Sequence, residues 1–343
     1  MAKTKIGFVG VGYWGPNLLR NFLSTGNAEV TAVCDADKTK LETFKRSLPN
    51  ASFVTDYEDV VKDGSLDAVV IATPARFHYD FAKRALSAGK SVFVEKPLAM
   101  TAAECEDLIK AADKAGKMIF VGHTFLYNQA VNVIKDYIEK GDLGDIYYLY
   151  SQRLNLGKVR EDVDVMWNLA PHDVSIMLHL VKSKPKSVSA RGFYHLRKDI
   201  ADVAFITLEF ENGVSSHIHV SWLDPNKVRK VTVVGSKKMV VYDDMAEDAR
   251  IVIYDKGIDK KHMDADLGKY DNYEKFLFIH RSGDILIPKL SFTEPLKVEV
   301  ASFVDCLRTG KKPVTDGEHG LETVRILEAA TKSMKSEGKA IKL

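Results

Sequence analysis

The stretch Gly10-Val11-Gly12-Tyr13-Trp14-Gly15 decides how this chain is expected to fold. It follows residues 5–9, a short apolar run of β-prone residues, and it precedes Pro16, which suits the first turn of a helix. Glycines at this spacing allow a tight turn, a close approach of the backbone to a pyrophosphate, and close packing of helix on strand. The stretch therefore predicts a dinucleotide-binding turn, with the cofactor held by Gly10, Gly12, Tyr13, Trp14 and Gly15 at the start of the helix.

A single glycine-rich turn is weak evidence, but an acid follows at the expected distance. Residues 29–34 predict a second strand, and it ends at Asp35, 25 residues after Gly10. A carboxylate at this point binds the hydroxyls of the adenosine ribose and repels a 2′-phosphate. We therefore expect NAD in preference to NADP, although Lys38 and Lys40 lie near enough in the sequence to weaken the repulsion.

Length and composition narrow the class of protein. A chain of 343 residues is long for one core, so two domains are expected. The net charge of +2 gives no electrostatic case for binding nucleic acid or an anionic membrane, and no apolar stretch reaches transmembrane length. Three scattered cysteines argue against a disulfide framework, and ten histidines without ligand spacing argue against a metal site. The N-terminus shows no secretory signal, so we expect a cytoplasmic protein.

The secondary-structure pattern changes along the chain. Residues 1–123 alternate strands and helices, which predicts an α/β Rossmann domain with a doubly wound parallel sheet. Residues 124–343 are expected to form a substrate and oligomerisation domain, also α/β, with an open, mostly antiparallel sheet. Residues 243–273 are expected to be an irregular excursion at the edge of that sheet. Helices are predicted at 295–309 and 317–335, and the segment of about 295–337 is expected to pack back on the first domain. The predicted strands of the second domain are 187–194, 203–210, 214–222, 228–234 and 239–242.

One of these strands bears on assembly. Val203, Ile206, Leu208 and Phe210 are interpreted as apolar residues on both sides of their strand. Both sides of the sheet would then be covered, one by helices and the other by a second copy of the chain. We therefore expect a homo-dimer or homo-tetramer.

Several short motifs carry a resemblance to a known family. The glycine stretch, Ala72-Thr73-Pro74, Ala88-Gly89-Lys90, Glu95-Lys96-Pro97 and a later histidine together resemble the Gfo/Idh/MocA oxidoreductases, over nearly the whole chain. Three further stretches are similar to the branch that contains UDP-N-acetylglucosamine and UDP-N-acetylglucosaminuronate 3-dehydrogenases: Gly122-His123-Thr124-Phe125-Leu126-Tyr127-Asn128, Arg153-Leu154-Asn155-Leu156-Gly157 and Trp167-Asn168-Leu169-Ala170-Pro171-His172-Asp173. The resemblance implies oxidation of a secondary hydroxyl, at C3 of a UDP-linked N-acetylhexosamine, by hydride transfer to NAD.

Such a reaction needs a group that takes the hydroxyl proton, and two residues qualify. Lys96 follows a parallel strand at the edge where such sheets bind ligands, and the resemblance implies that it contacts the substrate hydroxyl. A free lysine has a pKa of about 10.4, so it needs desolvation or neighbouring cations to act as a base. His172 has an ordinary pKa of about 6.5, and Pro171 predicts that it lies in the first turn of a helix. The sequence leaves open which of the two accepts the proton.

The chain departs from the family pattern beside this histidine. The family has an acid four residues before it, and here that position is Asn168, which cannot take a proton. The proton transfer therefore falls to His172 and Lys96. Asp173 is interpreted as a structural or capping acid.

The resemblance also implies the remaining site residues. The planar guanidinium suits a diphosphate, so Arg153 or Arg160 is a candidate anchor, with a solvated strand residue as the alternative for Arg160. A structural histidine is an equally good interpretation of His123. The predicted cofactor contacts outside the glycine stretch are Asp35, Thr73, Pro74, His78, Glu95 and Lys96. The predicted substrate contacts are Lys96, His123, Tyr127, Asn128, Arg153, Asn155, Asn168 and His172.

Two other functions fit the same motifs. One is a dehydrogenase of a free sugar, a sugar phosphate or an inositol. The other is a sensor that binds a dinucleotide without turnover, because the resembling family includes a galactose-regulon repressor. The presence of both Lys96 and His172 weighs against a sensor, whereas the fold alone would not.

Overall fold

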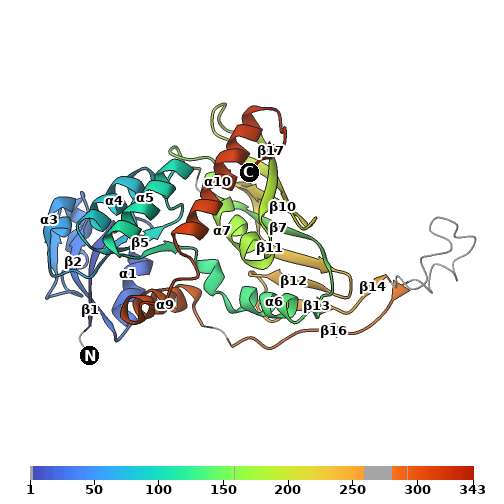
Figure 1. Cartoon of the computed structure of the whole chain (residues 1–343), viewed down its shortest axis with the longest axis horizontal. Helices are drawn as coiled ribbons and strands as arrows, with labels where there is room; N and C mark the ends of the chain where they lie inside the picture. The colour runs from blue at the N-terminus through green and yellow to red at the C-terminus, as the bar shows by residue number, and fades with distance from the viewer. Residues whose placement is uncertain (1–2, 158, 259–279, 292) are drawn as a thin grey trace, which may run out of the picture. The chain divides into compact units, whose positions relative to one another are not determined.

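A computed structural model describes residues 3–157, 159–258, 280–291 and 293–343. The chain forms two compact units. The first unit contains Met1–Asn128 and Thr293–Glu328, and the second contains Gln129–Phe292 and Ala329–Leu343. Each unit has its own large β-sheet (Figure 1). No helix in the described part of the chain is both long enough and apolar enough to cross a membrane.

The first unit is built on a six-stranded parallel sheet, in the order β3-β2-β1-β4-β5-β6. Helices α1 and α9 lie on one side of this sheet, and α3, α4 and α5 lie on the other (Figure 1). The order reverses between β1 and β4, which is the point where a doubly wound sheet opens a crevice for a ligand. Its strands are β1 (Thr4–Val9), β2 (Ala28–Cys34), β3 (Ser52–Val54), β4 (Ala68–Ile71), β5 (Ser91–Glu95) and β6 (Ile119–Gly122). Its helices are α1 (Gly15–Ser24), α2 (Lys38–Glu42), α3 (Tyr57–Lys62), η1 (Ala75–Phe77), α4 (His78–Ser87), α5 (Ala102–Ala115), η2 (Thr124–Tyr127) and α9 (Pro295–Thr309).

An aromatic cluster ties α9 to this sheet. The ring of Phe303 on α9 meets Phe22, Phe93 and Phe120 edge to face, at centroid distances of 5.9, 5.4 and 5.3 Å. Edge-to-face pairs of this kind stabilise a core beyond the area they bury. Helix α9, which follows the second unit's strands in the sequence, is thereby part of the core of the first unit.

The second unit is built on a nine-stranded sheet over the described residues, in the order β16-β13-β12-β11-β7-β10-β9-β8-β17. Neighbouring strands are antiparallel except for β7 and β10. The predicted α/β class, with a parallel Rossmann sheet and a second, mostly antiparallel sheet, is confirmed. The strands are β7 (Ile146–Leu156), β8 (Pro185–Phe193), β9 (Val203–Phe210), β10 (Ser215–Ser221), β11 (Leu223–Gly235), β12 (Met239–Asp243), β13 (Ile251–Tyr254), β16 (Ile285–Leu286) and β17 (Ile341–Lys342), with β14 (Gly257–Ile258) and β15 (His280–Arg281) as a separate pair. The helices are α6 (Gln129–Glu139) and α7 (Val165–Leu180), and α10 (Gly317–Lys335) is divided between the two units.

The prediction of an irregular segment from residue 243 is wrong in part. Residues Ile251–Tyr254 form β13, which pairs antiparallel with β12. Ile251 and Ile253 are buried and alternate with half-buried residues, so the strand has an inward face that its charged surroundings hid from a sequence pattern. Residues 259–273 of the same prediction lie outside the described residues.

The sequence predicts that a helix begins at Pro171, and this prediction is wrong. Helix α7 starts at Val165, where the Asp164 side chain accepts a hydrogen bond from the backbone N–H of Trp167. Pro171 lies inside α7, and His172 lies in the middle of that helix. Most of α7 is buried, and this burial offsets the backbone hydrogen bond that a proline removes.

Strand β9 carries apolar residues on both sides, as interpreted, with the half-buried Val203 on the side opposite Ile206, Leu208 and Phe210, but only one side is fully buried. Ile206, Leu208 and Phe210 share one face and are all buried. The opposite face presents Phe205, which is 47% exposed, and Glu209. On this outer face of the sheet the exposed aromatic residues are Tyr148, Tyr150, Phe193 and Phe205.

Candidate active site

The glycine stretch forms a tight turn between β1 and α1, at the point where the strand order reverses. Gly10 has a φ of +94°, and a Cβ there would lie 2.6 Å from the carbonyl oxygen of Ala72. A Cβ on Gly15 would lie 2.2 Å from the carbonyl oxygen of Gly10. A Cβ on Gly12 would meet nothing within 4 Å. Gly10 and Gly15 are therefore required by the chain itself, whereas the backbone at Gly12 faces open space that a ligand can approach.

Asp35 lies beside this turn at the end of β2. Its carboxylate accepts one hydrogen bond from the backbone N–H of Val11 and one from that of Asp37, both at 2.9 Å. The ammonium of Lys40 lies 3.6 Å from the Asp35 carboxylate. The predicted ribose-binding acid is thus held against the glycine turn, with one lysine near it.

These residues fit a bound dinucleotide. Besides the open backbone at Gly12, the hydroxyl of Thr73 is buried and has no hydrogen-bond partner among the described residues. Thr73 follows β4, the strand next to β1, so it lies at the carboxyl edge of the same sheet. An orphaned hydroxyl at that edge has a hydrogen bond to offer a ligand. Tyr13 is 95% exposed and Trp14 is 41% exposed, so both side chains of the turn are accessible.

Glu95 and Lys96 stand at the carboxyl end of β5, and Glu95 ties them to the glycine turn. The buried Glu95 carboxylate accepts a hydrogen bond from the indole N–H of Trp14 at 2.8 Å and one from the backbone N–H of Lys96 at 3.3 Å. Burial raises the pKa of Glu95 to about 7, against the opposing effect of the Lys96 charge. Lys96 itself is half-buried, and its peptide bond to Pro97 is cis. The structure thus brings the predicted cofactor residue Trp14 together with the predicted catalytic lysine.

His78, a predicted cofactor contact, is the first residue of α4, and its ring lies inside the unit. Its Nδ1 atom lies 2.7 Å from the carbonyl oxygen of Pro97, and its Nε2 atom lies 2.8 Å from that of Thr73. Burial lowers its pKa. Because both ring nitrogens face backbone carbonyls, the predicted direct contact with the cofactor is not what this geometry provides. The buried ring of His78 lies between the backbones of Thr73 and Pro97 and supports both.

Three predicted substrate contacts of the first unit also lie in its core. Tyr127 is stacked on Phe120 at 5.8 Å, and its hydroxyl shares a hydrogen bond of 3.1 Å with Thr315. Asn128 is buried. His123 is buried and meets His319 edge to face at 5.2 Å, and burial lowers its pKa well below the usual value. Tyr127 and Asn128 are thus packed in the core, whereas both ring nitrogens of His123 are buried with no hydrogen-bond partner among the described residues.

Glu299 on α9 is a buried acid that sequence reasoning missed. Its carboxylate accepts a hydrogen bond from the hydroxyl of Thr124 at 2.7 Å, and its Oε1 atom has no hydrogen-bond partner in the described part of the chain. Burial, and secondarily the charge of Glu95, raise its pKa well above the usual value. The signal was an acid between Leu296, Val300 and Phe303 on the inward face of a helix that was interpreted only as packing.

The second unit brings His172, Asn168 and Trp222 together. Asn168 and His172 are four residues apart on α7 and both are half-buried, so they are neighbours on one face of the helix. The Asn168 side-chain oxygen accepts a hydrogen bond from the indole N–H of Trp222 at 3.2 Å. Asn155 lies near the end of β7, two residues before Gly157, whose Cα packs against the Trp222 ring. Asn155, Asn168 and His172 are the predicted substrate contacts of the second unit apart from Arg153, and Trp222 was not predicted.

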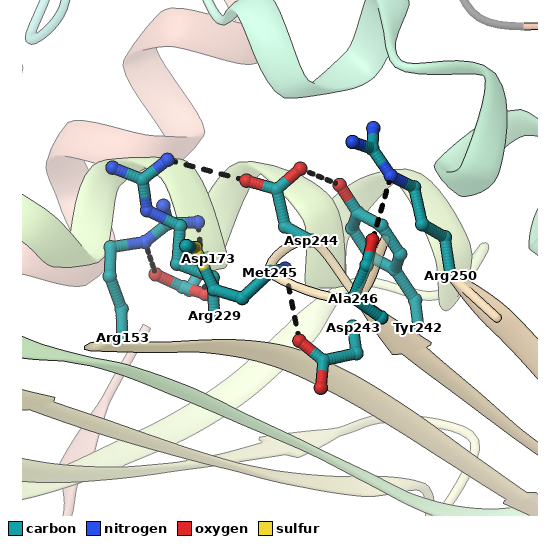
Figure 2. Close-up of polar contacts among 9 residues, drawn as sticks. All are labelled: Arg153, Asp173, Arg229, Tyr242, Asp243, Asp244, Met245, Ala246 and Arg250. Carbon is teal, nitrogen blue, oxygen red and sulfur yellow. Dashed lines mark hydrogen bonds and ion pairs between the residues drawn. The ribbon is translucent and has the colours of Figure 1, made fainter. Parts of the chain in front are cut away.

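Arg153 forms a buried ion pair with Asp173 (Figure 2). Its Nε atom lies 2.6 Å from the Asp173 carboxylate, and the two side chains are 7% and 1% exposed. On the neighbouring strand Arg229 stands opposite Arg153 in the register and pairs with Asp244 at 3.3 Å. The prediction that Arg153 anchors a diphosphate therefore conflicts with its place in the core, and Asp173 is the structural acid. Arg160 pairs with Asp162 through two hydrogen bonds of 2.8 and 2.7 Å and is more exposed.

Comparisons with known proteins show which family models match this chain. Residues 4–123 match the NAD-binding Rossmann fold of the GFO_IDH_MocA oxidoreductase family, and residues 131–241 match the GFO/IDH/MocA C-terminal domain. The 1-carboxy-3-chloro-3,4-dihydroxycyclohexa-1,5-diene dehydrogenase of Comamonas testosteroni is 29% identical over 228 residues, which cover 63% of this chain and 57% of that protein. The inositol 2-dehydrogenase of Salmonella typhimurium is 30% identical over 227 residues, which cover 63% of this chain and 66% of that protein. The chain thus spans less than two thirds of the length of these two curated relatives.

Several solved structures are similar over both units. The WlbA dehydrogenase of Bordetella pertussis, solved in complex with NADH and UDP-GlcNAcA, is 25% identical, with a TM-score of 0.81. The similarity covers 100% of this chain and 98% of that one. The two family matches together span more than half of the chain, and the two curated relatives described above are named dehydrogenases. The chain therefore belongs to the Gfo/Idh/MocA family of NAD-binding oxidoreductases.

Proposed function

We propose that this protein is an NAD-dependent dehydrogenase that oxidises a secondary hydroxyl, at C3, of a nucleotide-linked sugar such as a UDP-N-acetylhexosamine. The observation that carries the proposal is the position of Lys96, at the carboxyl end of β5 and bonded through Glu95 to the glycine turn. A cation at that edge lies where a doubly wound sheet receives its ligand. The similarity to a dehydrogenase solved with NADH and UDP-GlcNAcA favours a nucleotide sugar as the substrate class.

The residues of the first unit would hold the cofactor. The backbone around Gly12 and the start of α1 suit the pyrophosphate, and the orphaned hydroxyl of Thr73 offers one more hydrogen bond. Asp35 suits the ribose hydroxyls, which favours NAD over NADP. When bound, NAD supplies the nicotinamide ring that takes up the hydride from the carbon bearing the hydroxyl.

Residues of the chain itself would accept the proton of the substrate hydroxyl. Lys96 holds the substrate hydroxyl and exchanges its proton, and the Glu95 carboxyl beside it has a pKa of about 7, so it can exchange a proton near neutral pH. His172 is the second acid–base group, and Asn168, one turn earlier on α7, orients a hydroxyl without taking a proton. Variants of Lys96 and His172 with different pH profiles would identify which residue accepts the proton.

A second candidate substrate is a cyclitol. The 30% identity to an inositol 2-dehydrogenase favours it, and the same lysine and histidine would serve that reaction. A sensor without turnover is disfavoured because it would need neither Lys96 nor His172. The three cysteines are free and buried, which suits the reducing cytoplasm we propose as the location.

The test is the rate of NADH formation, followed by absorbance, across UDP-, dTDP- and GDP-sugars, free sugars, sugar phosphates and inositols. The proposal expects the highest kcat/KM with a UDP-N-acetylhexosamine or its uronic acid. A preference for inositol would replace the substrate class, and NAD binding without turnover of any compound would favour the sensor.

A further inference from the structure

His78 is placed between the two segments that carry the proposed cofactor and catalytic residues. Its Nδ1 atom lies 2.7 Å from the carbonyl oxygen of Pro97, the residue after Lys96. Its Nε2 atom lies 2.8 Å from the carbonyl oxygen of Thr73, which follows the neighbouring strand β4. The residue is 1% exposed, so no water competes for these contacts from the surface.

Whether one or both of these contacts are hydrogen bonds depends on whether the His78 ring carries one proton or two. A carbonyl oxygen only accepts, and a neutral imidazole has one N–H donor and one acceptor nitrogen. Neutral His78 therefore bonds one of the two segments and turns a lone pair toward the carbonyl of the other. The imidazolium form donates to both carbonyls and holds both segments.

Lys96 is the charged group that opposes this second proton. Burial is the largest influence and lowers the pKa of His78, the two carbonyls raise it, and the charge of Lys96 lowers it further. The other charged groups on the segments packed against His78 have bonds elsewhere. Asp107 of α5 is bonded to Tyr79 and Lys83, the Glu104 carboxylate to the backbone of Thr101, and Glu95 to Trp14.

We propose that His78 is a positioning residue for Lys96, clamping the Lys96–Pro97 segment to the Thr73 segment, and that the charge of Lys96 disfavours the second proton of His78. This inference rests on the proposed role of Lys96 in proton transfer. When Lys96 loses its proton, His78 gains one more readily and fixes both segments. While Lys96 is charged, the neutral form of His78 is favoured, and this form donates a hydrogen bond to only one of the two carbonyls. Such a coupling is reciprocal, so each proton disfavours the other by the same factor.

The first test needs no substrate. The protonation state of His78 is followed by NMR of protein with ¹⁵N-labelled histidine and bound NAD, and His78→Gln identifies the resonance. Lys96→Met should move the titration midpoint of His78 upward. The control Lys83→Met removes an ammonium that is bonded to Asp107, and it should leave the midpoint where it is. Equal midpoints in the wild type and Lys96→Met, or a ring that stays neutral in both throughout the titration, would overturn the proposal.

The second test separates positioning from general stability. His78→Phe removes both contacts and should lower kcat by about 10-fold or more, with KM and NAD affinity changed little. His78→Gln keeps one N–H donor and should recover part of kcat. A parallel fall of kcat, NAD affinity and melting temperature in both variants would reduce His78 to a structural role.

The two proposals fail in different ways. A midpoint that moves in Lys96→Met, in a protein that oxidises none of the panel compounds, would keep the link between His78 and Lys96 and refute the dehydrogenase. Turnover of a sugar with an unmoved midpoint would do the reverse.

Discussion

Three residues hold the backbone at Lys96, one of them directly and two through the neighbouring residues Glu95 and Pro97. Glu95 bonds the backbone N–H of Lys96, Trp14 holds the Glu95 carboxylate, and His78 contacts the carbonyl of the next residue. A backbone held on both sides of Lys96 fixes the position from which its side chain reaches a substrate. At the scale of single residues, the proposed chemistry depends on this arrangement.

Replacing Lys96 with methionine removes the ammonium and keeps most of the side-chain volume. We expect kcat to fall by about 10²–10⁴-fold, the usual range for a lost acid–base group, with NAD affinity nearly unchanged. NADH absorbance gives the rate, and quenching of tryptophan fluorescence gives the affinity. His172→Ala should also lower kcat and change the shape of the pH–rate profile. Either variant with near-normal turnover would mark its residue as structural.

Asp35→Ala should weaken NAD binding by about 10-fold or more, because charge-assisted hydrogen bonds to the ribose are lost. NADP binding should improve, because the repulsion of its 2′-phosphate is removed. The matched control is Asp35→Asn, which removes the charge but keeps an oxygen acceptor for the backbone N–H of Val11. Equal affinity of the unmodified protein for the two cofactors would contradict the assignment.

Glu299→Gln should change how stability depends on pH. The pKa of Glu299 is raised in the folded protein, so its favourable contribution is complete below about pH 4.3, the unfolded value, and is lost as the pH rises toward the folded value. Glutamine has no proton to lose. The free energy of unfolding of the variant, relative to wild type, should therefore increase between pH 5 and 8, by at most about 1.4 kcal/mol per pH unit. Urea unfolding at several pH values measures this, and a pH-independent difference would show that Glu299 is ionised when buried.

At the scale of elements, clear local signals predicted structure well. Helices α9 and α10 begin and end at the residues that the sequence predicts. Short elements such as β3 and α3 were not predicted, because three to six residues show too little periodicity. The prediction of a helix start at Pro171 was wrong because the burial of α7 outweighs the preference of proline for the first turn of a helix.

Some features of the candidate site could be predicted from the sequence, and others could not. Spacing predicted the glycine turn and the strand-end position of Lys96, because both follow from the order of strands along the chain. It did not predict that Tyr127 and Arg153 are buried, since their partners Thr315 and Asp173 come from distant segments. Burial is a tertiary property, and local sequence carries little of it.

The ion pair between β7 and α7 gives a prediction at this scale. Asp173→Asn leaves the Arg153 guanidinium buried without its carboxylate, which should cost about 3–5 kcal/mol of unfolding free energy. The control Asp162→Asn breaks the more exposed pair with Arg160 and should cost about 1 kcal/mol or less. Urea denaturation compares the two variants, and equal losses would show that the buried pair has no special weight.

At the scale of the whole molecule, the outer face of the second sheet is the feature to test. Tyr148, Tyr150, Phe193 and Phe205 are each 37–47% exposed on this face, a gathering that usually marks an interface. We expect a homo-dimer or homo-tetramer in solution. Phe205→Glu should shift the mass from light scattering toward the monomer, whereas Val314→Glu, at an exposed position of the first unit, should not. A mass near 38.3 kDa for the unmodified protein at micromolar concentration would contradict the expectation.

The central claim is that hydride leaves C3 of a nucleotide-linked sugar in a reaction that depends on Lys96. UDP-N-acetylglucosamine and its uronic acid, carrying deuterium at C3, test it most directly when each is mixed with the protein and NAD. The account predicts that the deuterium appears in the reduced nicotinamide by mass spectrometry, with a 3-keto sugar as the other product, and that Lys96→Met abolishes the transfer. Deuterium that stays in the sugar while NADH forms, or equal transfer by Lys96→Met, would contradict it.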